Sequence, residues 1–294
     1  MQITPSIIFC GMLIPALLVT LSVVIGRAWR EGREKFCTLP GVAIGAGLMI
    51  GMPCLVGNLS LFPPTSGWHW IFWLGAIVIV MAIVETVVFT HRVLVLGLCI
   101  GAGIAAMLLL GRGRIMLGRT WTGEEALLWV GLASIALIVS LVSACLVNAR
   151  VGPRTPACVL ALCASVAAAS VGLSGKSEML ANTAIIGAVC ACTIAGLSIV
   201  MPHLRLGVSV WFALVLLMNA TLWASLDPWY ASMPVMDGVL IAFAPLGVWV
   251  GLLADRQRWY AAPLVGMTAS GVMLAVPVYH LYETIVRYRA DGFL

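Results

Sequence analysis

Glu85 is the acidic residue that lies most clearly within an apolar stretch, Ile71 to Thr90. A carboxylate in hydrocarbon is costly, so an acid inside a membrane span is a candidate to bind a proton, a cation or a polar substrate. Glu85 also lies about five residues, or roughly 8 Å of helix rise, from the polar turn at His91 and Arg92. It therefore has a second interpretation, in which it reaches the membrane interface or pairs with an arginine of a neighbouring helix.

Asp237 begins another apolar stretch, shortly after Pro234. Proline suits the first turn of a helix, where its missing N–H has no partner to lose. A carboxylate in that turn complements the positive end of the helix dipole. The structural interpretation is a dipole-stabilised helix start, and the functional one is contact with a substrate or ion near the outer mouth.

The segment around His280 is a third candidate. His280 and Glu283 are three residues apart and share a helix face, as metal ligands can. A structural zinc site needs four ligands, so we expect no metal here. Glu283 also precedes Arg287 by four residues, which favours an ordinary helix ion pair, and Tyr279 and Tyr282 fit an interfacial aromatic belt.

An uncharged loop from Phe62 to Trp70 carries the densest group of aromatic residues, among them Trp68, His69 and Trp70. Tryptophan faces attract cations, so these side chains are candidates for an external ligand site. The alternative is a tryptophan belt that anchors the next helix at the membrane interface. Trp223, Trp229 and Tyr230 fit the same belt.

Sequence signatures of catalysis are missing. The chain contains neither Gly-x-Ser-x-Gly nor His-Glu-x-x-His. Gly175-Lys176-Ser177 is the end of a phosphate-binding loop motif, but Ser170 stands where that motif needs its first glycine. We therefore expect no enzyme activity and no cofactor.

Composition identifies the environment that these residues share. The chain is 62% hydrophobic and 9% charged, and its mean hydropathy is +1.11. A soluble domain carries roughly 25% charged residues, so this chain cannot cover a water-facing surface. The bilayer is the expected partner. The formal charge of +5 comes from residues beside predicted helix ends, which argues against nucleic-acid binding.

The elements that position the candidate residues are apolar segments of membrane-spanning length. A span needs about 20 apolar residues, and by this criterion the chain has about ten. The predicted spans are 4–26, 41–57, 70–90, 93–111, 124–147, 157–173, 179–202, 207–226, 235–254 and 260–282. The expected fold is an all-α polytopic membrane bundle that forms a single domain over residues 1–294, with no separate soluble domain.

Two further patterns concern helix shape and packing. Four prolines interrupt predicted spans and are expected to kink them: Pro15, Pro53, Pro245 and Pro277. Small residues four apart allow helix backbones to approach closely. We expect intramolecular packing at Gly41/Gly45, Gly47/Gly51, Gly97/Gly101, Ala161/Ser165/Ala169, Gly187/Ala191 and Gly266/Ser270.

Charge distribution predicts the orientation. The loop 27–40 contains Arg27, Arg30, Arg33 and Lys35, so the positive-inside rule places it in the cytoplasm and the N-terminus outside. With ten spans, 10 of the Lys and Arg residues lie inside and 6 outside. If segment 93–111 is re-entrant instead, the chain has nine spans, with 11 of these residues inside and 5 outside. We favour ten, because Val93 to Leu110 holds no polar residue. The expected location is the inner membrane of a bacterium.

In length and span count the chain is similar to the ten-helix drug/metabolite transporter class, although no motif of that class matches. The favoured function is a small-solute transporter or permease, with Glu85 as a coupling or substrate group and Pro53 and Pro245 shaping the cavity. The alternative is a non-transporting subunit, scaffold or assembly factor of a larger membrane complex, with other membrane subunits as partners.

Overall fold

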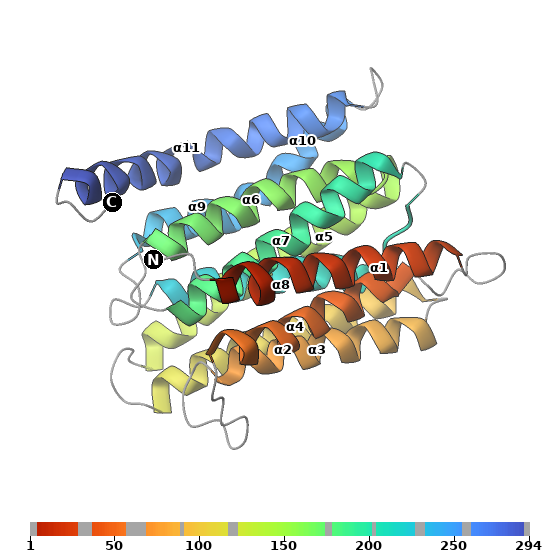
Figure 1. Ribbon diagram of the computed structural model, residues 1–294, viewed down its shortest axis with the longest axis horizontal. Helices are drawn as coiled ribbons and strands as arrows, with labels where there is room; N and C mark the ends of the chain where they lie inside the picture. Colours follow the sequence, from red (N-terminus) through yellow and green to blue (C-terminus); the bar gives the residue numbers. More distant parts are fainter. Residues whose placement is uncertain are drawn as a thin grey trace.

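The computed structural model describes residues 5–28, 37–56, 69–88, 91–116, 123–173, 178–201, 204–226, 233–254 and 260–290, and these ranges contain helices and no strand. In chain order the elements are η1 (Ile7–Leu13), α1 (Ile14–Ala28), α2 (Leu39–Val56), α3 (His69–Val87), α4 (Arg92–Met116), α5 (Gly123–Val151), α6 (Arg154–Leu173), α7 (Glu178–Val200), α8 (Val208–Ser225), α9 (Val235–Phe243), η3 (Ala244–Leu246), α10 (Gly247–Leu253) and α11 (Ala261–Ala290). They run side by side as an all-α bundle (Figure 1).

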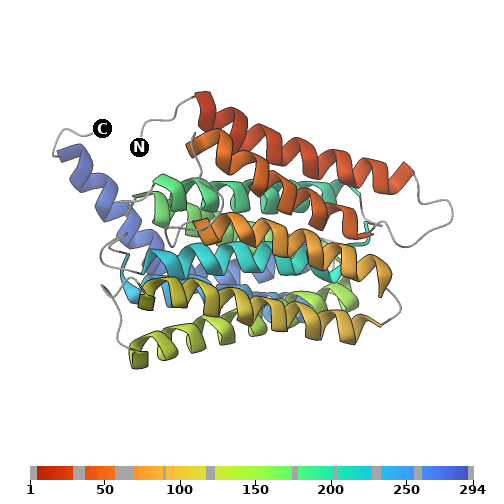
Figure 2. The same cartoon turned by 90° about the horizontal axis from the view of Figure 1, so that it is seen from below.

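The lengths of these helices confirm a polytopic membrane protein. Eight described segments are long and apolar enough to cross a bilayer, and two shorter apolar ones lie at Leu39–Cys54 and Phe72–Val87. Segment Arg92–Leu110 is among the eight, which favours a span there over a re-entrant segment. The start of η1 and the end of α11 lie at the same end of the bundle (Figures 1 and 2), as an even number of crossings requires.

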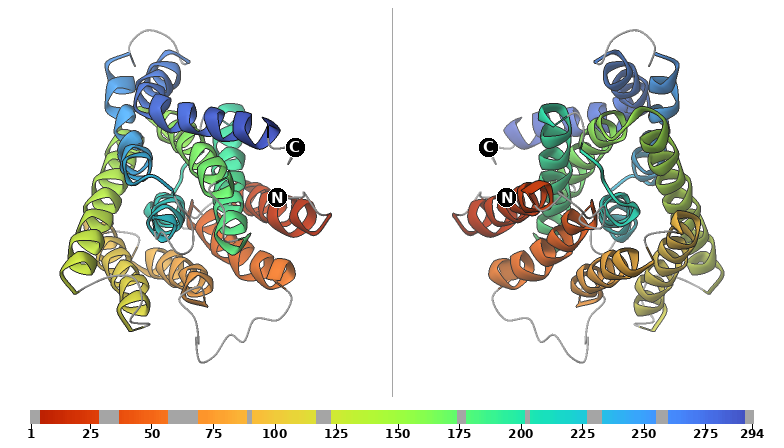
Figure 3. Two further views of the ribbon diagram at one scale, coloured as in Figure 1. Left: turned by 90° about the vertical axis from the view of Figure 1, so that its left-hand side faces the viewer. Right: turned by 90° about the vertical axis from the view of Figure 1, so that its right-hand side faces the viewer.

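Helix α8 forms the centre of the bundle, and the other helices surround it in the end-on views (Figure 3). Every residue from Ser209 to Ser225 is buried. Three polar side chains of α8 bond to carbonyl groups of their own helix: Asn219 to Val215, Thr221 to Leu217 and Met218, and Ser225 to Thr221. Backbone acceptors on the same turn thus satisfy the donor groups of these three side chains, whereas Ser209 Oγ and the indole N–H groups of Trp211 and Trp223 have no partner among the described residues.

Lipid-facing surfaces lie on the outer helices. Only 28% of the span Arg92–Leu110 is buried, and Val93 on α4 is 85% exposed. Exposed apolar side chains on this scale would be unstable in water, but in hydrocarbon they carry no such penalty. A peripheral helix therefore needs apolar residues on every face, so hydrophobicity alone does not show which face packs against the rest of the protein.

The four prolines have different surroundings. Pro245 lies in the 3₁₀ turn η3, which separates α9 from α10, so the predicted interruption of the ninth span is confirmed. Pro15 follows the π-helical segment η1, which ends at Leu13. Pro53 and Pro277 lie within α2 and α11, which continue past them, and a change of helix axis there stays a prediction.

Small residues bring several helices into close contact, as expected. A Cβ added at Gly45 would lie 2.6 Å from the Gly75 carbonyl oxygen, and one at Gly51 would lie 2.8 Å from that of Cys10. At Gly251 the added Cβ would lie 2.6 Å from the carbonyl oxygen of Ala262. Helix pairs α2/α3, α2/η1 and α10/α11 therefore depend on glycine for their separation.

The packing prediction is wrong at Gly97 and Gly101. An added Cβ at Gly97 or Gly101 meets nothing within 4 Å, because that face of α4 points away from the rest of the bundle. On α6 the prediction holds in part, since Ala161 is buried and Ser165 Oγ lies 3.5 Å from Sγ of Cys192 on α7, but Ala169 is exposed. Small-residue spacing alone does not say which face of a helix meets a neighbour.

Candidate functional site

Glu85 lies near the end of α3 and is only 4% exposed. Its Oε1 accepts the backbone N–H of Val208 at 2.6 Å, and its Oε2 accepts that of Ser209 at 2.8 Å. These amides begin α8 and have no carbonyl partner within the helix. The positive end of the helix dipole also favours a negative charge at this place. The Glu85 carboxylate therefore caps α8 from a different helix.

The local chain at the start of α8 makes this distant cap necessary. The N-cap residue is Gly207, which has no side chain with which to cap the helix, and its own N–H donates to the carbonyl oxygen of Cys37 at 3.0 Å. A Cβ at Gly207 would lie 2.6 Å from Oε2 of Glu85. Sequence reasoning missed this pairing, although an apolar helix start without a Ser, Thr, Asp or Asn cap is a signal that a partner must come from elsewhere.

Asp237 and His280 form a second polar site, at the end of the bundle where α9 begins and α11 approaches its end. Asp237 is 3% exposed and lies in the first turn of α9, as the sequence indicates. The Nδ1 atom of His280 is 2.9 Å from Oδ1 and 3.0 Å from Oδ2 of Asp237. An ionised carboxylate only accepts hydrogen bonds, so Nδ1 is the donor when Asp237 is ionised. The His280 side chain is 40% exposed.

A cavity of about 210 Å³ lies beside this pair, between α6, α9 and α11. Its wall includes Ser170 from α6, and Thr284 and Tyr288 from α11. Ser170 is 4% exposed, and its Oγ has no hydrogen-bond partner among the described residues. The cavity thus joins a buried carboxylate, a partly exposed imidazole and an unpaired hydroxyl.

Glu283 does not share a site with His280. Its Oε1 accepts the hydroxyl of Tyr279 at 2.8 Å, and its Oε2 lies 3.9 Å from the Arg287 guanidinium, which confirms the predicted helix pair. His280 instead bonds across to Asp237 on α9. In the described part of the chain no group of three His, Cys, Asp or Glu residues is placed to hold a metal ion.

The interrupted ninth span, α9 to α10, lies against α5 and α11. Ser140 of α5 donates to the carbonyl oxygen of Ala242 at 3.2 Å, and Ser270 of α11 donates to that of Ala244 at 2.8 Å. Trp249 of α10 donates its indole N–H to Ser143 at 2.8 Å. Side chains of α5 and α11 therefore supply donors to carbonyl groups around the 3₁₀ turn, which allows a break within the bundle.

The aromatic predictions have mixed outcomes. Trp68, Trp229 and Tyr230 lie outside the described residues, as do the side chains of His69 and Trp70, so the proposed ligand site there stays a prediction. Trp223 is 6% exposed and packs on Trp129, with ring centroids 5.9 Å apart. Its assignment to a lipid-facing belt is wrong, because the ring is buried within the protein.

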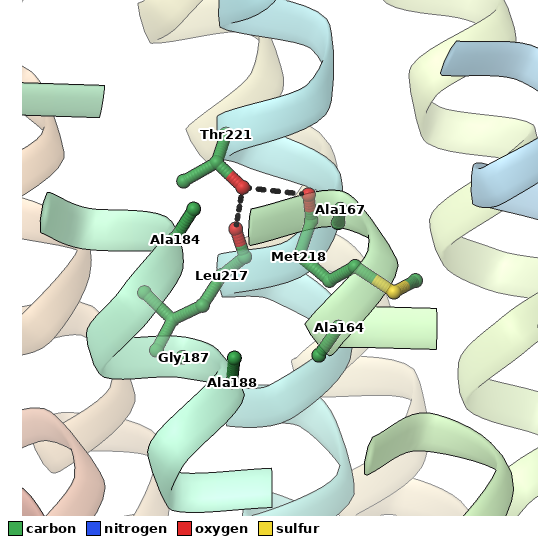
Figure 4. Close-up of a pocket in the computed structure, with 8 residues that line it drawn as sticks. All are labelled: Ala164, Ala167, Ala184, Gly187, Ala188, Leu217, Met218 and Thr221. Carbon is green, nitrogen blue, oxygen red and sulfur yellow. Dashed lines mark hydrogen bonds between the residues drawn. The ribbon is translucent and has the colours of Figure 1, made fainter. Parts of the chain in front are cut away.

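The centre of the bundle is closely packed. Where α6, α7 and α8 meet, a cavity of only about 10 Å³ is lined by small residues such as Ala164, Ala184 and Gly187 (Figure 4). The Thr221 hydroxyl turns back onto carbonyl groups of its own helix. This space is barely large enough for one water molecule, which would need two or more polar partners.

A larger apolar groove of about 460 Å³ lies between α3 and α4, with Ile77, Val80 and Ala105 in its wall. Glu85 lines none of these three cavities.

Comparison of the chain with protein-family models, curated proteins and solved structures finds no match. Only the geometry of the polar sites therefore bears on function.

Proposed function

We propose that the protein is a small-solute transporter or permease and that the solute binds in the cavity between α6, α9 and α11. The observation that carries this proposal is the Asp237–His280 pair at the wall of that cavity. Ionisable side chains within membrane spans are costly, and in membrane proteins they commonly mark substrate, ion or proton pathways. Here one partner is buried and the other is exposed enough to exchange protons with water.

The interrupted span supports the same proposal. Discontinuous helices line the binding sites of many transporters, where the break provides both polar groups and a place to bend. The break at Pro245 divides the span whose first turn carries Asp237. A change at η3 would therefore move α9, and with it the carboxylate, relative to α11.

Glu85 has a different part in this proposal from the one first expected. Its two oxygens are occupied by the amides of Val208 and Ser209, and it is remote in sequence from the cavity residues. We assign it to fixing the start of α8 rather than to coupling.

Transport is tested with the full chain reconstituted in liposomes that contain a trapped pH-sensitive dye. Addition of small amines, alcohols and carboxylates to the outside should move protons faster than in protein-free liposomes, which report passive entry of neutral amines and acids. Asp237→Asn should abolish this flux, whereas Glu124→Gln, which removes an exposed carboxylate in the first turn of α5, should preserve it. A flux that survives Asp237→Asn, or no flux with any solute from stable protein, would overturn the proposal.

The open face of α4 favours a second candidate function, that of a subunit in a larger membrane complex. Gly97 and Gly101 form a small-residue face that no described residue covers, and such faces commonly pack against another helix. Gly97→Leu with Gly101→Leu should then release a copurifying partner without a change in thermal stability. Gly131→Leu, at another uncrowded glycine, is the matched control. Retention of the same partner by the double variant would contradict this candidate.

A further inference from the structure

The cavity beside Asp237 is asymmetric in charge. In the part of the chain that the structure describes, its wall contains one carboxylate, from Asp237, and no lysine or arginine. The nearby Arg287 guanidinium faces Glu283, whose carboxylate balances it. Among the described residues, the positive partner of Asp237 is thus His280 when its ring is protonated.

Ser170 supplies an independent indication that a polar ligand belongs in this place. It lines the cavity, it is more than nine-tenths buried, and its Oγ has no partner among the described residues. A buried hydroxyl without a partner is unfavourable, and a ligand that bonds to it removes that cost. Asp237 and Ser170 approach the cavity from different helices and offer acceptor oxygens to the same ligand.

The wall also has an apolar part. Leu173, Met233, Pro234 and Leu281 form it together with the aromatic ring of Tyr288. Cavities that hold drug-sized ligands measure about 300–1,000 Å³, so a space of about 210 Å³ suits a smaller solute. With one carboxylate and one histidine the wall offers too few ligands for a metal ion. An ammonium group attached to a compact apolar body fits both parts of the wall.

We propose that this cavity binds a small organic cation, a primary or secondary ammonium with an apolar body, in exchange for a proton on His280. The ammonium N–H groups donate to the Asp237 carboxylate and to Ser170 Oγ. Binding replaces the imidazolium as counter-ion, so the proton leaves from His280 to water through its exposed edge. The inference rests on the proposed transport function and names its substrate class and its coupling group.

Among the described residues, the groups of α11 near the imidazole are Tyr279, Glu283, Thr284 and Tyr288, of which Tyr279 and Glu283 bond to each other. Thr284 donates its hydroxyl to the His280 carbonyl oxygen. Helix α9 contributes Asp237, and α6 contributes the Ser170 hydroxyl. Because binding releases the proton of His280, mass action makes binding stronger as the pH rises.

Equilibrium binding tests the inference without any need for transport. Three probes of one shape and different charge are titrated calorimetrically into the purified full chain: benzylammonium, benzyl alcohol and benzoate. Benzylammonium should bind at least tenfold more tightly than the other two at pH 8, and at least fivefold more tightly at pH 8 than at pH 5.5. Exchange for one proton sets an upper limit of about tenfold per pH unit.

Variants separate the roles of the residues. Asp237→Asn should remove benzylammonium binding, and Ser170→Ala should weaken it several-fold. His280→Gln should keep the binding but remove its pH dependence, and it carries the test if Asp237→Asn does not fold. Glu124→Gln, which changes an exposed carboxylate in the first turn of α5, is the control with unchanged affinity. Equal binding of all three probes, tighter binding of benzoate, or unchanged pH dependence in His280→Gln would overturn the inference.

The binding and flux experiments together distinguish a failure of the cation site from a failure of the transport proposal. Selective benzylammonium binding without any flux in liposomes would contradict transport and leave the cation site standing. Flux of a neutral or anionic solute, with no benzylammonium binding, would support transport and refute the cation site.

Discussion

The cap that Glu85 provides to α8 gives a sharp stability prediction, because α8 is the central helix. In Glu85→Gln one side-chain oxygen still accepts an amide N–H, but the new NH₂ group faces the second amide. Hydrogen bonds to a charged acceptor contribute about 1.5–3 kcal/mol, and removal of one partner leaves a buried donor unpaired. Glu85→Gln loses one hydrogen bond and weakens the other, so it should lower the free energy of unfolding by about 2–4 kcal/mol.

The assay is thermal unfolding of the full chain in mild detergent, followed by the loss of the monodisperse peak in size-exclusion chromatography. With roughly 2–4 °C lost per kcal/mol for chains of comparable size, the midpoint should fall by about 5–15 °C. Glu124→Gln is the matched control, since Glu124 is exposed in the first turn of α5. Its midpoint should change by less than about 2 °C, because exposed charges contribute little.

A double-variant cycle identifies the cap as the cause. Gly207→Ala places a Cβ 2.6 Å from Oε2 of Glu85, so it should also destabilise, by about 1–3 kcal/mol. Because both changes disturb one contact, the double variant should be more stable than the sum of the two losses predicts. A midpoint for Glu85→Gln within 2 °C of the unaltered protein, or strict additivity in the cycle, would refute the capping interpretation.

Three further predictions concern helix packing and are measured by the same unfolding assay. Gly247→Ala should destabilise by about 1–3 kcal/mol, because the added Cβ overlaps Ser270 of α11; an unchanged midpoint would mean that α10 and α11 lie farther apart. Gly101→Ala should leave the midpoint unchanged or raise it slightly, since nothing lies within 4 Å and alanine favours the helix by up to about 1 kcal/mol; a clear loss would show that this face is covered. Trp249→Phe should cost about 1 kcal/mol through the lost hydrogen bond to Ser143, and the further removal of Ser143 by Ser143→Ala should add little.

Much of the fold could be predicted from the sequence because the signals are local. A stretch such as Val93 to Leu110 is long and apolar enough to span a membrane whatever it packs against. Pro234 indicates where α9 begins and thereby places Asp237 in its first turn. Glu283 and Arg287 pair because they are one helical turn apart. Each of these conclusions depends on residues within about one turn or one helix length of each other.

The candidate site could be predicted only in part. Asp237 and His280 each stood out as polar residues near span ends, but their pairing joins residues 43 positions apart. The partners of Glu85 are 123 and 124 positions away. Nothing in the local pattern of either segment specifies the other.

The sequence by itself determined the membrane environment, the helical spans and the scarcity of ionisable groups within them. The tertiary structure alone decided that α8 is central, that Glu85 caps it, that Asp237 meets His280 at a cavity, and that Gly97 and Gly101 face outward. The physical reason is that hydrocarbon requires apolar residues on every face of a span, so hydrophobicity does not encode which faces meet. That choice depends on backbone approach at small residues and on hydrogen bonds between distant segments, which exist only once the helices are packed together.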